Sequence, residues 1–226
     1  MHARIRLLLR TGSANSLQPE IYERTMNAAL TQYLDECRQK WDSIPAKRKE
    51  KLQSIADYIR KKREHDVSAK LTFICTHNSR RSHFCQIWAA VSARYMNQEG
   101  IETYSGGTEA TAFNPRAVAA IERAGFSVKN LDQGAENPRY EVFYDEDADP
   151  LICYSKTFDD PPNPQENFAA VMTCSHADEN CPFVPGTEFR MAIPFDDPKE
   201  SDGTERETQI YDERCRQIAT QMLFMI

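Results

Sequence analysis

The chain has 226 residues, of which 27% are charged, and its formal net charge is −6. This length fits one ordinary domain with an extension, or two small domains. The negative charge argues against nucleic-acid binding, and the sequence has no apolar run long enough to cross a membrane. Met1–Arg10 is too short for a signal-peptide core, so we expect a cytoplasmic protein whose seven cysteines are catalytic or redox thiols.

Residues 18–64 carry apolar side chains at helical spacing and predict two helices. The break between them falls at 42–45, where Pro45 suits the first turn of the second helix. We expect residues 1–67 to form a helical extension and residues 68–226 to form the catalytic domain.

From residue 70 onward, strand-like and helix-like stretches alternate. Strands are predicted over 71–74, 101–104, 168–173 and 189–193, and helices over 82–97, 115–124 and 205–225. Such alternation is typical of an α/β fold, here a four-stranded parallel sheet flanked by helices, with the active site beyond the carboxyl ends of the strands. Residues 140–165 interrupt the pattern with two strand-like runs and predict a β-hairpin insertion.

Cys75 ends the first of these strands and opens a short polar loop that leads into a helix. Backbone N–H groups at such a loop bind anions and favour a thiolate over a thiol. Arg81 offers a bidentate donor fork to two oxygens of an anion. Asn78 tolerates the left-handed conformation of a tight loop, and Ser82 can donate its hydroxyl to the sulfur. A buried structural cysteine is the alternative, but the pattern favours a nucleophilic thiolate beneath a tetrahedral oxyanion.

Two further features follow the third and fourth strands. Cys174 and Cys181 flank a polar spacer that includes His176, and a redox pair explains it better than a zinc site, which would lack a fourth ligand. Seven residues of helix would separate the two Cα atoms by about 10 Å, too far for a disulfide. We therefore expect the spacer to be looped, or to unwind as the bond forms. Asp197, in a loop stiffened by proline, is a candidate proton donor to a leaving oxygen.

These motifs resemble a known family. Cys75-Thr-His-Asn-Ser-Arg-Arg-Ser82 resembles the cysteine loop of the low-molecular-weight protein tyrosine phosphatases and of the arsenate reductases that share their fold. Thr173-Cys-Ser-His-Ala-Asp-Glu-Asn-Cys-Pro182, followed by Phe195-Asp-Asp-Pro198, is similar to the thioredoxin-coupled arsenate reductases in particular. The resemblance covers residues 70–226 apart from the insertion.

The resemblance implies a low-molecular-weight phosphatase-like fold and an arsenate reductase with a three-cysteine relay. It implies that Cys75 attacks arsenate held by Arg81, while Asp197 protonates the departing oxygen. Cys174 then attacks Cys75 and releases arsenite, and Cys181 takes over the disulfide, which thioredoxin or another thiol reductant reduces. No metal or cofactor is expected, and the implied oxyanion-binding loop consists of Thr76, His77, Asn78, Ser79, Arg80 and Ser82.

The chain departs from the family at three positions. His77 replaces a usual loop glycine, and Arg80 stands where many relatives carry a second loop cysteine. Gln86 stands where the reductases often carry a glutamate that helps to bind potassium, which argues against that ion and leaves its binding open. With no second cysteine inside the loop, the attack on Cys75 is expected to come from Cys174.

Two other functions remain open. The first is a low-molecular-weight protein tyrosine phosphatase with a Cys75 phosphoenzyme intermediate, in which Cys174 and Cys181 guard Cys75 against over-oxidation. The second is a redox-sensing or partner-binding module whose helical extension carries the interaction. Phosphatases usually have aromatic residues after the Asp-Pro pair, whereas Lys199-Glu-Ser follows here, which favours the reductase.

Overall fold

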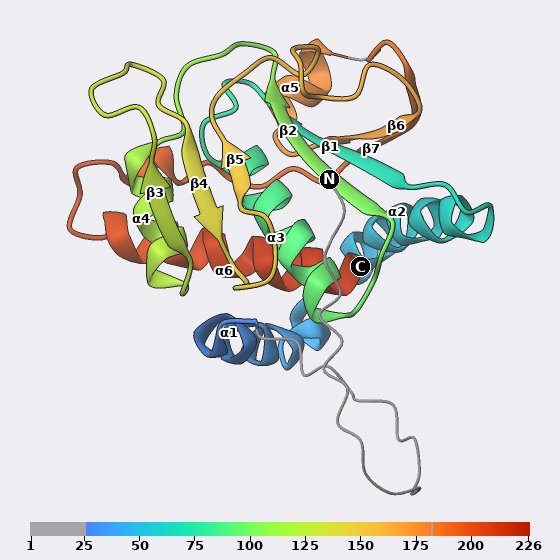
Figure 1. Ribbon diagram of the computed structural model, residues 1–226, viewed down its shortest axis with the longest axis horizontal. Helices are drawn as coiled ribbons and strands as arrows, with labels where there is room; N and C mark the ends of the chain where they lie inside the picture. The colour runs from blue at the N-terminus through green and yellow to red at the C-terminus, as the bar shows by residue number, and fades with distance from the viewer. Residues whose placement is uncertain (1–25, 182) are drawn as a thin grey trace, which may run out of the picture.

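A computed structural model describes residues 26–181 and 183–226 of the protein (Figure 1). In chain order its elements are α1 (Ala28–Arg38), the 3-10 helix η1 (Trp41–Ser43), α2 (Ala46–Glu64), β1 (Ala69–Cys75), α3 (Arg81–Tyr95), β2 (Ile101–Gly107), α4 (Pro115–Arg123), β3 (Ser127–Asn130), β4 (Tyr140–Phe143), β5 (Leu151–Cys153), β6 (Phe168–Met172), α5 (Ser175–Asn180), β7 (Thr187–Ala192), the 3-10 helix η2 (Pro198–Ser201) and α6 (Glu207–Met225).

The central sheet has the strand order β2-β1-β6-β7, and each neighbouring pair is parallel. This confirms the predicted four-stranded parallel sheet. Because the strands are parallel, their carboxyl ends meet at one edge, where Cys75 pairs with Gly107 and Ile74 with Met172. The chain that leaves β6 toward Cys174 therefore starts beside Cys75.

The two faces of this sheet pack against different partners. Leu71, Phe73 and Val171 join a large core that includes buried side chains of α2, α3 and α6. The opposite face forms a smaller core covered by α5 and by loops; its members include Ile74, Phe168, Ala170, Met172, Ala177 and Val184. Helices flank the sheet as expected, but the long ones lie on one side. Cys75 and Cys174 belong to the smaller core, and Cys181 packs against it.

The N-terminal extension packs onto the rest of the fold. Leu30 and Leu34 of α1 and Leu52 and Ile55 of α2 are fully buried in the large core. The two predicted helices are confirmed from residue 28 onward, and the part predicted over 18–25 lies outside the described residues. Pro45 is the N-cap of α2 and not a first-turn residue. Figure 1 shows α6 running between α1 and α3, both of which it contacts.

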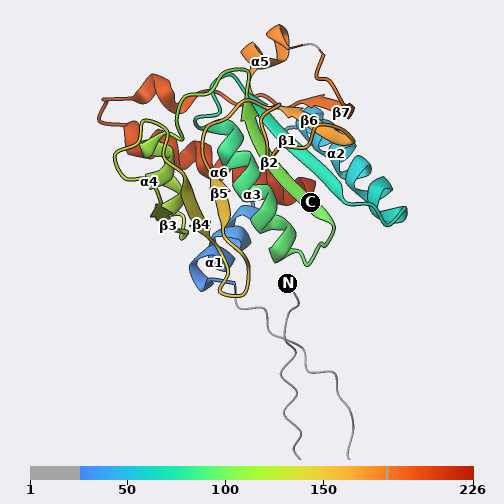
Figure 2. The same ribbon diagram turned by 45° about the horizontal axis from the view of Figure 1, so that its top comes forward.

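The predicted insertion does contain a hairpin, since β4 and β5 pair antiparallel. The sequence missed a further strand, β3, which pairs with β4 and makes a separate three-stranded sheet. β3 is only four residues long and mostly exposed, so its sequence carries little apolar alternation. After β5 the chain returns to the edge of the central sheet, where Gly107 pairs with Thr157 (Figure 2).

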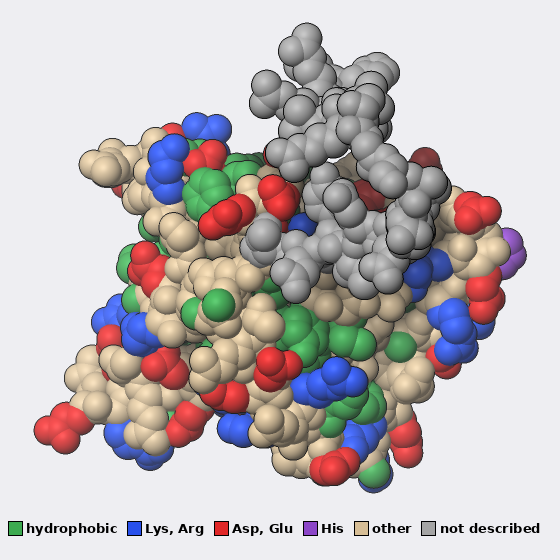
Figure 3. Space-filling model, turned by 60° about the horizontal axis from the view of Figure 1, so that its bottom comes forward, with side chains coloured by type: hydrophobic (Ala, Val, Ile, Leu, Met, Phe, Trp, Pro, Cys, Tyr) green, Lys and Arg blue, Asp and Glu red, His purple; other side chains and the backbone are tan. Residues whose placement is uncertain are grey.

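None of the described helices is long and apolar enough to span a membrane. Figure 3 shows acidic and basic side chains interspersed over the described part of one face. Such mixing gives that part of the face no field of a single sign.

Candidate functional site

The loop from Thr76 to Arg80 closes tightly around the end of β1. Cys75 is only 3% exposed, and Glu109 N–H donates to the Thr76 carbonyl at 2.8 Å. A Cβ atom on Gly107 would meet the Thr76 carbonyl oxygen at 2.6 Å and the Asn78 nitrogen at 2.7 Å. Only glycine allows β2 to approach the loop this closely, which explains the small residues at the end of that strand.

A chain of side-chain hydrogen bonds leads to the Cys75 sulfur. Asn78 is buried and adopts a left-handed φ of 43°, as predicted. Its Nδ2 donates to Ser82 Oγ at 2.8 Å, and Ser82 Oγ lies 3.1 Å from Cys75 Sγ. Because the Ser82 oxygen already accepts a hydrogen bond, its own proton is free to point at the sulfur.

The segment after β5 braces the same loop. Ser155 Oγ donates to the His77 carbonyl at 2.9 Å, and Lys156 N–H donates to Asn78 Oδ1 at 3.0 Å. Both Ser155 and Lys156 are buried. The sequence predicted no function for this segment, because hydrogen bonds between a side chain and a backbone group 78 residues away leave no signal in the residue pattern.

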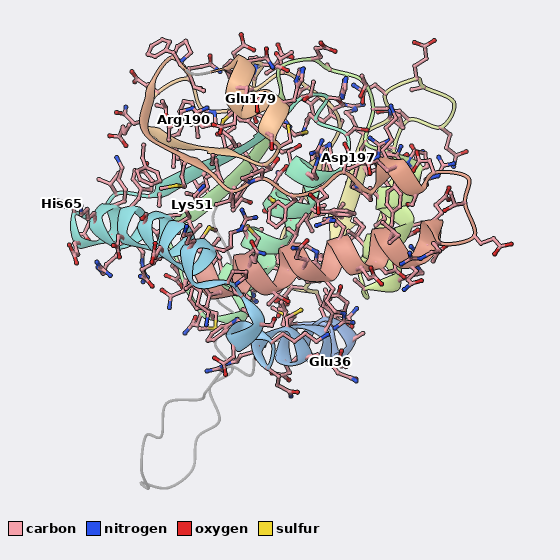
Figure 4. The ribbon with its side chains drawn as sticks, turned by 180° about the vertical axis from the view of Figure 1, so that it is seen from behind. Glu36, Lys51, His65, Glu179, Arg190 and Asp197 are labelled. Atoms are coloured by element: carbon pink, nitrogen blue, oxygen red, sulfur yellow. The ribbon has the colours of Figure 1, made fainter. Side chains whose placement is uncertain are left out.

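Arg81 and Asp197 meet across the mouth of the loop. Arg81 Nη2 donates to Asp197 Oδ2 at 2.6 Å, and Nη1 donates to the Phe195 carbonyl at 3.0 Å. Asp197 also accepts from the Lys199 N–H and caps η2. Asp196, by contrast, is 93% exposed in its side chain and contacts Arg214 at 3.2 Å. Of the two aspartates, the fold brings Asp197 to the loop. Figure 4 labels it beyond the end of β7.

The side chain of Arg80 turns toward α6. Its Nε donates to Tyr211 Oη at 2.8 Å, and its guanidinium lies 3.7 Å from Asp202 Oδ2 and 3.9 Å from Asp197 Oδ1. Burial and the hydrogen bond to Asp202 raise the pKa of Tyr211 to about 12, so its hydroxyl stays protonated. Arg80 therefore ties the loop to α6 through its side chain, a contact that the sequence did not reveal.

Cys174 lies against the Cys75 loop. Its sulfur is 3.5 Å from Thr76 Oγ1, and that hydroxyl is also 3.1 Å from His176 Nδ1. Cys174 caps α5, since its sulfur accepts from the Ala177 N–H at 3.4 Å. Cys174, which the resemblance implies as the resolving thiol, therefore contacts Thr76, the residue that follows Cys75 in the loop. The structure places both cysteines at the same sheet edge, as predicted.

Cys181 lies at the other end of α5 and is partly exposed. Of the two alternatives for the spacer, a loop or a segment that unwinds, the loop is wrong: residues 175–180 form a six-residue helix with Cys174 and Cys181 as its caps. Arg190 on β7, labelled in Figure 4, holds the C-terminal end of α5. Its Nη2 donates to Asp178 Oδ1 at 2.6 Å and to the Cys181 carbonyl at 3.1 Å. Burial raises the pKa of the Cys181 thiol, and the charge of Arg190 opposes that shift. A disulfide to Cys174 therefore requires α5 to unwind.

The remaining cysteines lie in apolar surroundings. All seven are free thiols in this structure, and Cys37, Cys85, Cys153 and Cys215 are buried. Burial raises the pKa of Cys153 and of Cys215 to about 12, and it raises the pKa of Cys85 strongly. Thiols held protonated in this way are poor nucleophiles. The fold therefore disfavours thiolate chemistry at these buried positions.

Within the described residues, no group of three His, Cys, Asp or Glu side chains could hold a metal ion. Gln86 donates from Nε2 to the Thr103 carbonyl at 3.3 Å, so one end of its amide is already engaged by β2.

A loop that closes over a buried thiol, with an arginine and a carboxylate at its mouth, defines a class of thiol enzymes that act on tetrahedral oxyanions.

No protein-family model matches the chain. It is 29% identical over 135 residues to an arsenate reductase from Halalkalibacterium halodurans, covering 60% of this chain and 78% of that protein. It is also 29% identical over 144 residues to an arsenate reductase from Bacillus subtilis, covering 64% and 84%.

Among solved structures, a low-molecular-weight phosphotyrosine phosphatase from Vibrio cholerae matches 70% of this chain and 94% of its own, at 11% identity and a TM-score of 0.47. A thioredoxin-dependent arsenate reductase from Corynebacterium glutamicum matches 84% and 92%, at 16% identity and a TM-score of 0.37. The chain is therefore similar in sequence to bacterial arsenate reductases over about three fifths of its length.

Proposed function

We propose that the protein is an arsenate reductase that passes oxidation along Cys75, Cys174 and Cys181. The observation that carries this proposal is the contact between the Thr76 hydroxyl and the Cys174 sulfur at 3.5 Å. A phosphatase needs only the Cys75 loop and an acid. A second thiol against that loop, with a third at the far end of the same short helix, supplies the electron pair that reduction requires.

In the first step the Cys75 thiolate attacks arsenic, and an As–S bond forms. Arg81 and the loop N–H groups hold the remaining oxygens, and Asp197 donates a proton so that one oxygen leaves as water. Arg81 must then exchange its bond to Asp197 for the bound anion. Arsenic is still pentavalent after this step.

In the second step the Cys174 thiolate attacks the Cys75 sulfur. A disulfide forms, the S–As bond breaks, and its electron pair stays on arsenic, which leaves as arsenite. Cys181 then attacks Cys174, releases the Cys75 thiolate and moves the disulfide to Cys174–Cys181. Thioredoxin or another external dithiol reduces that bond. Because the cycle needs a supply of reduced thiol, we assign the enzyme to the cytoplasm.

A phosphatase with a Cys75 phosphoenzyme intermediate is the second candidate. Arsenate and phosphate are tetrahedral anions of the same charge, so the loop accepts either. The loop and the Arg81–Asp197 pair support this activity equally well. The two candidates differ in their demand for Cys174 and Cys181.

The test is arsenite production with thioredoxin, thioredoxin reductase and NADPH. We expect the Cys75→Ser, Cys174→Ser and Cys181→Ser variants to lose turnover, while Cys37→Ala, which removes a buried thiol of α1, keeps it. Turnover that survives Cys181→Ser would exclude the relay. Hydrolysis of 4-nitrophenyl phosphate that is lost in Cys75→Ser but indifferent to Cys174→Ser, without arsenite production, would establish the phosphatase instead.

A further inference from the structure

Arg48, in the first turn of α2, reaches out of the N-terminal extension to the chain that follows β7. Its Nη2 donates to the carbonyls of Ile193 and Pro194, both at 3.0 Å. Its Nε donates to Gln221 Oε1 at 2.6 Å, which fixes the plane of the guanidinium. That plane lies over the Phe195 ring, with the guanidinium carbon 4.4 Å from the ring centroid. One side chain therefore contacts three consecutive residues.

These three residues lead directly to Asp197. β7 is an edge strand of the central sheet, and the segment after it stays paired with the chain that follows β6. Ile193 N–H donates to the Met172 carbonyl at 2.8 Å, and Phe195 N–H donates to the Thr173 carbonyl at 3.0 Å. Arg48 of α2 supplies further donors to this segment, at the carbonyls of Ile193 and Pro194. The Phe195 carbonyl accepts from Arg81 at 3.0 Å. Phe195 thus contacts two guanidinium groups, that of Arg48 in the N-terminal extension and that of Arg81 at the start of α3.

We propose that Arg48 is a positioning residue for Asp197, and that the N-terminal extension is for this reason part of the catalytic apparatus. Catalytic groups must be held within about 0.5 Å of their working position, and a loop at a sheet edge does not achieve this by itself. The proposal rests on the proposed function in one respect, the role of Asp197 as the acid. That role is the same for a reductase and for a phosphatase.

The alternative is that Arg48 only anchors α2. Other cations of α2 show what a simple anchor or a surface pair looks like: Lys62 pairs with Glu188, Lys49 lies 3.9 Å from Asp42, and Arg60 lies 3.0 Å from Asp57. These three pair with carboxylates. Arg48 instead bonds uncharged carbonyls in the approach to Asp197, as Lys51 does at the end of β7.

Two further observations support the positioning role. Burial lowers the pKa of Arg48 to about 10, so the fold accepts a cost of desolvation to hold the guanidinium there. Lys51, one turn further along α2, donates to the Ala192 carbonyl at 3.0 Å and extends the contact to the end of β7 (Figure 4).

The experiment compares Arg48→Met and Arg48→Lys with Arg60→Met, an exposed position of the same helix whose contacts stay within α2. In the folded Arg48→Met enzyme we expect kcat to fall about tenfold or more because the acid is misplaced. The KM of this variant for arsenate should stay within about twofold of the wild-type value, since the oxyanion loop is intact. We expect the kcat of Arg48→Lys to lie between those of the wild type and Arg48→Met, because an ammonium group cannot bond both carbonyls and also stack on the Phe195 ring.

A double-mutant cycle separates positioning from anchoring. If Arg48 acts through Asp197, Arg48→Met causes no further loss of kcat in the Asp197→Asn background. An anchor that acts elsewhere lowers kcat by the same factor in both backgrounds, which would overturn the proposal.

Hydrogen exchange gives a readout that does not require turnover. We expect the amides of residues 193–203 to exchange faster in folded Arg48→Met than in the wild type and in Arg60→Met. Unchanged exchange and unchanged kcat in a folded variant would refute the proposal. If the wild-type protein shows neither activity, the proposed function fails, and hydrogen exchange still decides whether Arg48 holds this segment. If Arg48→Met does not fold, Arg48→Lys answers both questions.

Discussion

Arg81 and Asp197 are joined by a hydrogen-bonded ion pair of 2.6 Å between Nη2 and Oδ2. The arginine proposed to bind the oxyanion and the carboxylate proposed to protonate the leaving oxygen are therefore in contact without substrate. An incoming anion competes with Asp197 for the Arg81 fork.

Asp197→Asn removes the proposed proton donor but keeps the size of the side chain. We expect kcat for arsenite production to fall about 10²- to 10⁴-fold, the range that general acid catalysis contributes. Asp196→Asn is the matched control, because this neighbour is exposed and contacts only Arg214 among the ion pairs described. Equal losses in the two variants would show that charge near the loop matters and that proton donation by Asp197 does not.

Ser82→Ala removes the hydroxyl that lies 3.1 Å from the Cys75 sulfur. We expect Cys75 to react about tenfold more slowly with iodoacetamide at neutral pH, because its thiolate loses a hydrogen bond worth about 1 to 1.5 kcal/mol. Mass spectrometry of the modified peptide measures the rate. Ser54→Ala, which removes a half-buried hydroxyl of α2 that donates to the Glu50 carbonyl, is the control. An unchanged rate in Ser82→Ala would show that the backbone of the loop alone activates the thiol.

His83 makes stability depend on pH. It is fully buried, stacks on Phe113 at 4.1 Å, and burial followed by the charge of Lys156 holds its pKa well below 6.5. The unfolded chain takes up a proton below about pH 6.5, whereas the folded protein does not. Stability from this group is therefore fully present above pH 6.5 and falls as the pH drops below it, by at most about 1.4 kcal/mol per pH unit.

Urea unfolding at several pH values tests this expectation. His83→Phe keeps the stacking on Phe113 and should flatten the acid side of the stability curve. The control is His65→Gln, an exposed position at the end of α2 (Figure 4) that should keep the wild-type slope. A slope that is the same in His83→Phe and in the wild type would mean that other groups cause the acid sensitivity.

Oxidation should unwind α5. Its six residues separate Cys174 from Cys181, and a continuous helix of that length holds the two Cα atoms about 10 Å apart. We expect residues 175–180 to lose hydrogen-exchange protection when the reduced protein is treated with diamide, but not in Cys181→Ser. Arg190→Met should accelerate disulfide formation, because Arg190 bonds both Asp178 and the Cys181 carbonyl. Full protection in the disulfide form would contradict this structural change.

The sequence by itself determined the parallel sheet and the position of Cys75 at the end of its first strand. It also indicated the left-handed Asn78. These are local properties, since strand and helix periodicity, a short polar loop and the backbone tolerance of one residue all lie within a few positions of one another. The motif spacing likewise predicted that Cys174 lies on the same edge as Cys75.

Only the tertiary structure decided what surrounds these groups. The helix between Cys174 and Cys181 depends on Arg190 from another strand, and the bracing of Asn78 depends on Lys156, 78 residues away. The contact of Arg48 with the Ile193 carbonyl spans 145 residues. Hydrogen bonds from side chains to distant backbone carbonyls require no particular residue at the acceptor, so they leave no pattern in the sequence. Folding alone brings the N-terminal extension to the loop that carries Asp197.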